Sequence, residues 1–68
     1  MNDETFNLSI RKFLKTVGVK SQHEIEGAVS RGLAEGRISG HESLPATMVL
    51  SIAGLGLEVK FDGSIELE

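Results

Sequence analysis

Two histidines and seven serines are the side chains of this sequence that most often carry catalysis or metal binding. His23 and His41 are distant in the sequence, and neither lies in a ligand motif such as H-E-x-x-H. None of the serines lies in a G-x-S-x-G turn, which would expose a nucleophile above a sheet. The sequence therefore predicts solvent-exposed histidines, no catalytic residue, no bound metal and no cofactor.

A short glycine-rich segment, Gly54-Leu55-Gly56, is the nearest approach to a phosphate-binding loop. Such a loop needs a helix N-terminus after it, where backbone N–H groups can bind the phosphate. Here an alternating apolar pattern, typical of a strand, follows the glycines. The segment is thus predicted to be a hairpin connection and not a nucleotide site.

A basic stripe on the first predicted helix is the candidate interaction surface. Its spacing of three and four residues is that of one helix face, and a row of cations can bind an acidic partner or phosphates. A solvated helix face is the alternative, because cations are also favoured near the carbonyl end of a helix. The stripe consists of Leu8, Arg11, Lys12 and Lys15, with Lys20 just beyond them.

The N-terminal half has two apolar runs with helical spacing. The first contains Phe6, Ile10, Phe13, Leu14 and Val17, with Asn2 as its N-cap and Gly18 as its terminator. The second follows a capping box from Ser21 to Glu24 and contains Ile25, Ala28, Val29 and Leu33, before Gly36. Two helices are predicted, over residues 3–17 and 21–35.

After Pro45 the apolar spacing changes from helical to alternating, which predicts strands over residues 46–52, 57–61 and 65–68. A four-residue connection from Ala53 to Gly56 would pair Leu50 with Val59 and Met48 with Phe61. A second connection at Asp62–Ser64 would pair Phe61 with Ile65. The predicted fold is a single α+β domain, residues 1–68, with two N-terminal helices on one face of a three-stranded antiparallel meander and the phenylalanines in its core.

The length and composition of the chain bear on its size, its stability and its compartment. At 68 residues the chain has material for one small domain, which often needs bracing, and with no cysteine this cannot be a disulfide. A homodimer is one device that would supply the bracing. The lack of cysteine, the acidic start and the lack of an apolar span predict a cytoplasmic protein that does not bind membranes.

Nucleic acid is not expected as a partner, although two helices and a hairpin would suit a winged helix-turn-helix regulator. The net charge is −3, and Glu24 and Glu26 would open the recognition helix. That fold also uses three helices, where this sequence predicts two.

The sequence resembles a family of short uncharacterised bacterial proteins, a domain of unknown function. The resemblance rests on one pattern in the N-terminal half and a second in the middle of the chain, namely F-N-x-S-I-R-K-F-L-K-x-V-G-V-x-S-Q-x-E-I-E from Phe6 to Glu26, and Leu44-Pro45-Ala46. It implies a stand-alone bacterial domain and assigns no residue a role. The leading hypothesis is a non-enzymatic interaction or accessory domain that binds an unknown protein partner or itself; a nucleic-acid-binding regulator is the alternative.

Overall fold

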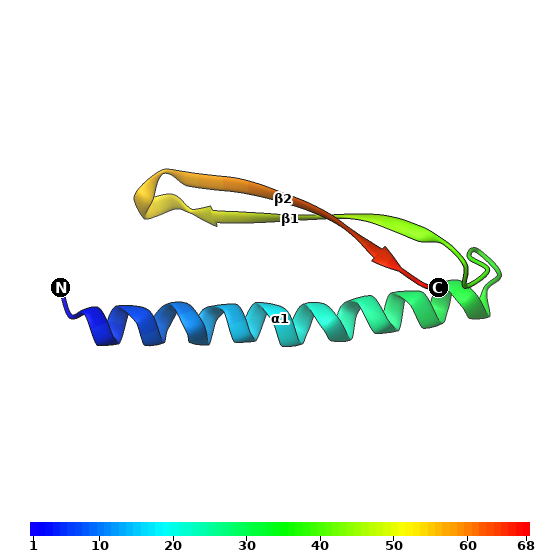
Figure 1. Ribbon diagram of the computed structural model, residues 1–68, viewed down its shortest axis with the longest axis horizontal. Helices are drawn as coiled ribbons and strands as arrows, with labels where there is room; N and C mark the ends of the chain where they lie inside the picture. Colours follow the sequence, from blue (N-terminus) through cyan, green and yellow to red (C-terminus); the bar gives the residue numbers. More distant parts are fainter. The chain divides into compact units, whose positions relative to one another are not determined.

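The computed structural model describes all residues, 1–68, as one helix followed by one hairpin. The elements are α1 (Asp3–Ala34), β1 (Ser43–Ile52), the short 3₁₀ turn η1 (Ala53–Leu55) and β2 (Leu57–Glu66) (Figure 1). They form two compact units, Met1–Arg37 and Ile38–Glu68.

The start of α1 follows the sequence signals. Asn2 has an extended backbone, and its side-chain oxygen accepts a hydrogen bond from the Thr5 N–H at 3.0 Å. Asp3 and Glu4 then place negative charge in the first turn, beside the positive end of the helix dipole. The N-cap prediction is confirmed.

The prediction of two helices is wrong, because α1 continues without a break through Gly18 and Ser21. Gly18 does not adopt the left-handed conformation that would end a helix. The two apolar runs are in phase: Leu14 and Ile25 are eleven residues apart, which is about three turns of helix. One straight helix therefore presents the first run and the start of the second, Ile25 and Ala28, on the same side, whereas Val29 and Leu33 lie about 100° and 140° round the helix from Ala28. We call this side the apolar stripe of α1, and it consists of Phe6, Ile10, Phe13, Leu14, Val17, Ile25 and Ala28.

The end of α1 is specified by Gly36, as predicted. Gly36 has a φ of +72°, and its N–H donates to the Leu33 carbonyl at 3.2 Å. The Arg37 N–H donates to the Gly32 carbonyl at 2.9 Å. This pair of bonds is a Schellman motif, in which a left-handed residue lets the chain turn back to satisfy the last carbonyls.

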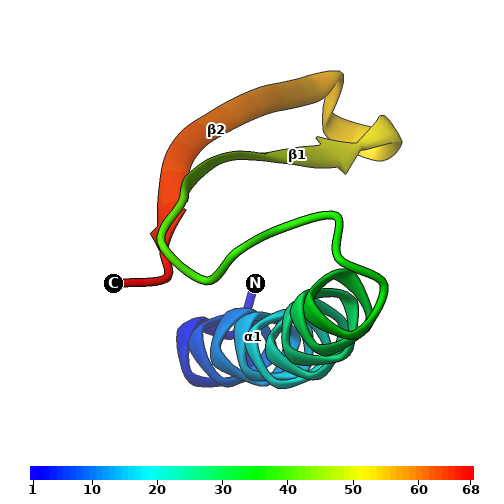
Figure 2. The ribbon, with the colours of Figure 1, turned by 90° about the vertical axis from the view of Figure 1, so that its right-hand side faces the viewer.

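The hairpin has the predicted register around its turn. β1 and β2 pair antiparallel, with Leu50 opposite Val59 and Met48 opposite Phe61. The connection runs from Ala53 to Gly56, where a φ of +61° suits glycine. Figure 2 shows the two strands side by side and coiling together.

The three-stranded meander is also wrong, because β2 does not turn at Asp62–Ser64. Instead Asp62 pairs with Thr47 and Ser64 with Pro45, so the strand runs on to Glu66. β1 begins at Ser43, earlier than predicted, and so supplies partners for this continuation. Ile65 pairs with Leu44 and not with Phe61. The fold is therefore α-β-β, with a two-stranded sheet.

Alternation along the strands gives the hairpin one polar and one apolar face. On the polar face the Thr47 hydroxyl donates to Asp62 at 3.2 Å and the Ser43 hydroxyl donates to Glu66 at 2.8 Å. Opposite residues share a face in an antiparallel pair. The apolar face consists of Leu44, Ala46, Met48, Leu50 and Ile52 from β1, and Leu57, Val59, Phe61 and Ile65 from β2.

Neither unit has a core of its own. No hydrophobic residue of the chain is buried, and Phe6, Phe13 and Phe61 are 49%, 52% and 54% exposed. The prediction that the phenylalanines form a core is therefore wrong for this chain. Within its own unit, neither the single helix nor the two-stranded sheet has a second layer against which to bury its apolar side.

Candidate functional site

The predicted basic stripe divides on α1. Leu8, Arg11, Lys12 and Lys15 lie on one exposed side of the helix, and Leu8 is 64% exposed. At about 100° per residue, Lys20 lies about 140° round the helix from Lys15. The division follows from the continuity of α1, since Lys20 was expected in a turn between two helices. The basic stripe thus has four members, and Lys20 borders the apolar stripe instead.

A shallow hollow lies along the helix between these two cations. It is lined by Lys15, Thr16, Val19 and Lys20. The Thr16 hydroxyl donates to the Lys12 carbonyl at 3.1 Å, so it is used within the helix. The hollow offers two cations and an apolar edge, which would suit an anionic group at the surface.

The two histidines lie in different units and both are exposed, His23 on α1 and His41 in the linker before β1. The Nδ1 atom of His41 is 3.0 Å from a Glu68 carboxylate oxygen. Both side chains of that pair are about two-thirds exposed, at 69% and 68%. No three His, Asp or Glu side chains gather where they could hold a metal ion.

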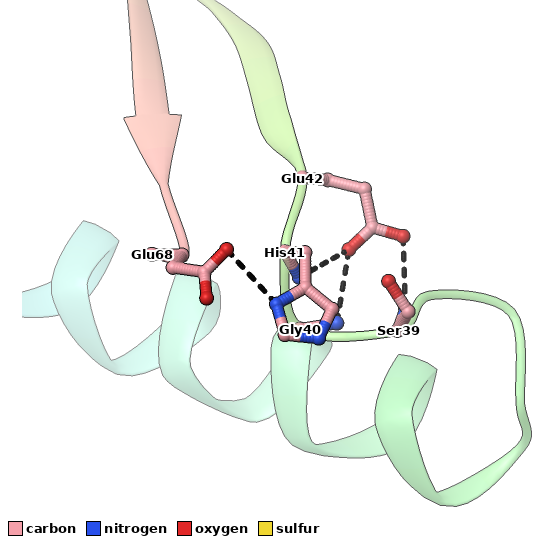
Figure 3. A network of polar contacts seen from close by, with 5 residues as sticks. All are labelled: Ser39, Gly40, His41, Glu42 and Glu68. Atoms are coloured by element: carbon pink, nitrogen blue, oxygen red, sulfur yellow. Dashed lines mark hydrogen bonds and ion pairs between the residues drawn. The ribbon is translucent and has the colours of Figure 1, made fainter.

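Sequence reasoning missed a carboxylate site around Glu42, at the start of the hairpin. The Glu42 carboxylate accepts hydrogen bonds from the backbone N–H groups of Ser39, Gly40 and His41, at 2.8, 3.0 and 3.1 Å (Figure 3). Three successive N–H groups turned toward one point form an anion-binding nest. The signal in the sequence is Gly40, whose φ of +97° lets the chain curl round the carboxylate.

The hydrogen bonds of the nest make the Glu42 carboxyl group more acidic. The Ser39 N–H is the largest cause, and together with the other backbone donors it lowers the pKa of Glu42 from 4.5 to about 2. The Glu42 carbonyl also accepts from the Leu67 N–H at 3.0 Å. Because Glu42 fills the nest, we assign it a structural role in closing the open end of the hairpin.

A second carboxylate, Glu66, is held on the polar face. The hydroxyls of Ser64 and Ser43 each donate to it at 2.8 Å, and these two bonds lower the pKa of Glu66. Both hydroxyls therefore hold the Glu66 carboxylate in place on the hairpin. Like Glu42, Glu66 ties residues of the hairpin together.

Comparison with known proteins places the chain in a family. A family model described as "Family of unknown function (DUF6494)" matches residues 1–68. The chain belongs to the DUF6494 family. This confirms the resemblance to a domain of unknown function, and membership of DUF6494 assigns no residue a role. No curated protein and no solved structure matches the chain.

One earlier alternative, a winged helix-turn-helix regulator, can be compared with this DUF6494 structure. A helix-turn-helix requires a turn between two helices, and α1 contains none, so that form of nucleic-acid binding loses its structural basis. No helix combines the length and the apolar composition that crossing a bilayer requires. The surfaces that depart most from an ordinary solvated exterior are the apolar stripe of α1 and the apolar face of the hairpin.

Proposed function

We propose that this DUF6494 protein is a non-enzymatic interaction module, which binds a protein partner or a second copy through its uncovered apolar surfaces. One observation carries the proposal: no hydrophobic residue of the chain is buried. Burial of apolar surface is the main favourable term in folding and association, about 25 cal/mol per Å². An extended apolar surface of this kind on a small protein is typical of an interaction site.

The patterning of both units supports the same proposal. Seven apolar residues of α1 lie on one side of the helix between Phe6 and Ala28, a span of about six turns, and most side chains of the hairpin segregate by face. Single apolar residues scattered over a surface are ordinary, whereas apolar residues gathered on one face of an element are typically buried against a second layer. The basic stripe lies away from the apolar stripe and would contribute charge to a partner at its rim. We place the interaction in the cytoplasm, because the chain has no cysteine.

A quantitative capture experiment tests the proposal. The tagged chain is compared with Ile10→Lys, which puts a charge into the apolar stripe, for recovery of protein from a cell lysate and for self-association in sedimentation. We expect the wild type to retain a partner or associate with itself, and Ile10→Lys to reduce that binding at least tenfold. A chain that stays monomeric and retains no protein above the tag control would contradict the proposal.

A matched variant separates the two sides of α1. Changing Arg11, Lys12 and Lys15 together to Glu alters the basic stripe and leaves the apolar stripe intact. If the apolar surfaces carry binding, this variant keeps most of it. If it loses binding while Ile10→Lys keeps it, the basic stripe is the interaction face and the apolar surfaces are not.

A further inference from the structure

The free edge of β2 restricts the kind of partner that can bind more than either apolar surface does. The sheet has only two strands, so each has one free edge, and an isolated two-stranded hairpin is marginally stable in water. Additional strands, or packing of the sheet against a helix, are the usual means of stabilising such a hairpin, and a free strand edge allows the first. A further strand could pair with the free edge of β1 or with the free edge of β2.

The two free edges differ in their hydrogen-bonding groups. The Leu67 N–H donates to the Glu42 carbonyl, which continues the strand register as a hydrogen-bonded pair. In an antiparallel ladder such pairs alternate with pairs whose N–H and C=O groups point outward. Pro45 falls on an outward-pointing position, so the free edge of β1 lacks a donor there.

The free edge of β2 is uninterrupted. The same alternation applies to β2, where every second residue has its N–H and C=O groups pointing outward. These residues are Glu58, Lys60, Asp62, Ser64 and Glu66. None of these is proline, so every position has both a donor and an acceptor. Their side chains all lie on the polar face.

We propose that the β2 edges of two copies pair antiparallel about a two-fold axis at Phe61, which makes one continuous four-stranded sheet. This inference rests on the proposed function and names its partner: a second copy of the chain. In this register Phe61 faces Phe61 of the second copy and Leu57 faces Ile65, so the apolar faces match. Lys60 faces Asp62 twice, once in each direction, on the polar face.

The charges on β2 favour this register over the two registers in which the two-fold axis is shifted by one residue. A two-fold at Lys60 would oppose two lysines and bring Glu58 against Asp62. A two-fold at Asp62 would oppose two aspartates and bring Glu58 against Glu66. Like charges directly opposite each other destabilise a strand pair. Moving the axis further, to Val59 or Gly63, restores unlike pairs but leaves part of β2 without a partner. The axis at Phe61 uses nearly the whole strand and opposes unlike charges.

Two cysteine variants test this register, since the chain has no native cysteine. Glu58 of one copy should face Ser64 of the other as a hydrogen-bonded pair, with Cα atoms about 5.5 Å apart, within the range of a disulfide. Equal amounts of Glu58→Cys and Ser64→Cys are mixed and oxidised mildly. We expect a disulfide-linked heterodimer in the mixture and little cross-linked dimer from either variant alone.

The controls make each outcome decisive. In the proposed register two copies of residue 58 lie about 20 Å apart, or six residues along a strand. Efficient cross-linking of either variant with itself would therefore overturn the proposal in favour of another pairing. A monomer at high micromolar concentration with no mixed disulfide would overturn it as well. In that case the capture of other proteins by the wild type still tests the proposed function separately.

A charge exchange adds a second test that does not depend on cysteine. Lys60→Glu should raise the dimer dissociation constant about tenfold, because two attractive pairs become repulsive. The double variant Lys60→Glu/Asp62→Lys should return to within about threefold of the wild type. Far-UV circular dichroism checks that each variant keeps its strands. Failure of the double variant to recover, with its strands intact, would contradict the register.

Discussion

The helix and the hairpin are incomplete in different ways. α1 satisfies its backbone internally, with an Asn2 cap at one end and the Gly36 motif at the other, and lacks only a cover for its apolar stripe. The hairpin lacks a cover for its apolar face and also leaves two strand edges open. A missing apolar cover can be supplied by many surfaces, whereas an open edge accepts only another strand in register. The hairpin is therefore the unit that specifies its partner more narrowly.

Gly18→Pro tests whether α1 is continuous, and it has the largest expected effect on stability. Proline in a helix interior removes a hydrogen bond and clashes with the preceding turn, at a cost of about 3 kcal/mol or more. We expect a large loss of helical circular dichroism and a lowered thermal midpoint. If helical content were unchanged, the chain would turn at Gly18, and α1 would be two helices.

The end of α1 offers a smaller effect. Gly36→Ala places a side chain at a φ of +72°, which costs an L-residue about 1–2 kcal/mol. We expect the free energy of unfolding, measured with urea, to fall by about that amount. Gly18→Ala is the control, since both changes remove a glycine but only Gly36 has the left-handed backbone. Equal effects of the two changes would count against the observed termination.

Gly18→Ala is itself a prediction of opposite sign. Beyond the backbone of its own helical turns, a Cβ at Gly18 meets nothing within 4 Å, and alanine favours helix over glycine by about 1 kcal/mol. The variant should therefore be more stable than the wild type by up to about 1 kcal/mol. Thermal unfolding followed at 222 nm would measure this, and a destabilised Gly18→Ala would restore the two-helix interpretation.

The smallest expected effect is the acid response of the hairpin. The pKa of Glu42 is lowered to about 2 in the folded chain from 4.5, so its ionised form is favoured by folding. Its contribution to stability is complete above about pH 4.5 and is lost as pH falls toward 2. Glu42→Gln should remove this part of the pH dependence, which can be followed by NMR shifts of the Ser39 and Gly40 amides. An unchanged acid response would show that the nest does not hold the carboxylate.

The sequence predicted elements best where two independent constraints agreed. The Leu50–Val59 pairing required both a turn of even length and matched faces, and the structure has this pairing. The N-cap at Asn2 and the terminator at Gly36 were likewise predicted from two signals each, the residue type itself and the apolar run that begins or ends beside it.

The wrong predictions each relied on a local signal alone. Gly18 and Ser21 resemble a helix end and a cap, but each is worth only about 1 kcal/mol, less than a continuous helix gains over several turns. Asp62-Gly63 resembles a turn, yet the unpredicted start of β1 at Ser43 gave the strand partners to continue. The Glu42 nest depends on the backbone of three residues together, and Gly40 alone, one of eight glycines, did not indicate which carboxylate the backbone would surround.

Amide hydrogen exchange of the hairpin shows whether β2 completes its sheet with a second copy. The N–H groups of Lys60 and Asp62 point outward from β2, and those of Thr47 and Val49 point outward from β1. We predict slow exchange at Lys60 and Asp62 that becomes slower as protein concentration rises, with fast exchange at Thr47 and Val49 throughout. Equally fast exchange of all four amides at every concentration would contradict the pairing of two β2 edges.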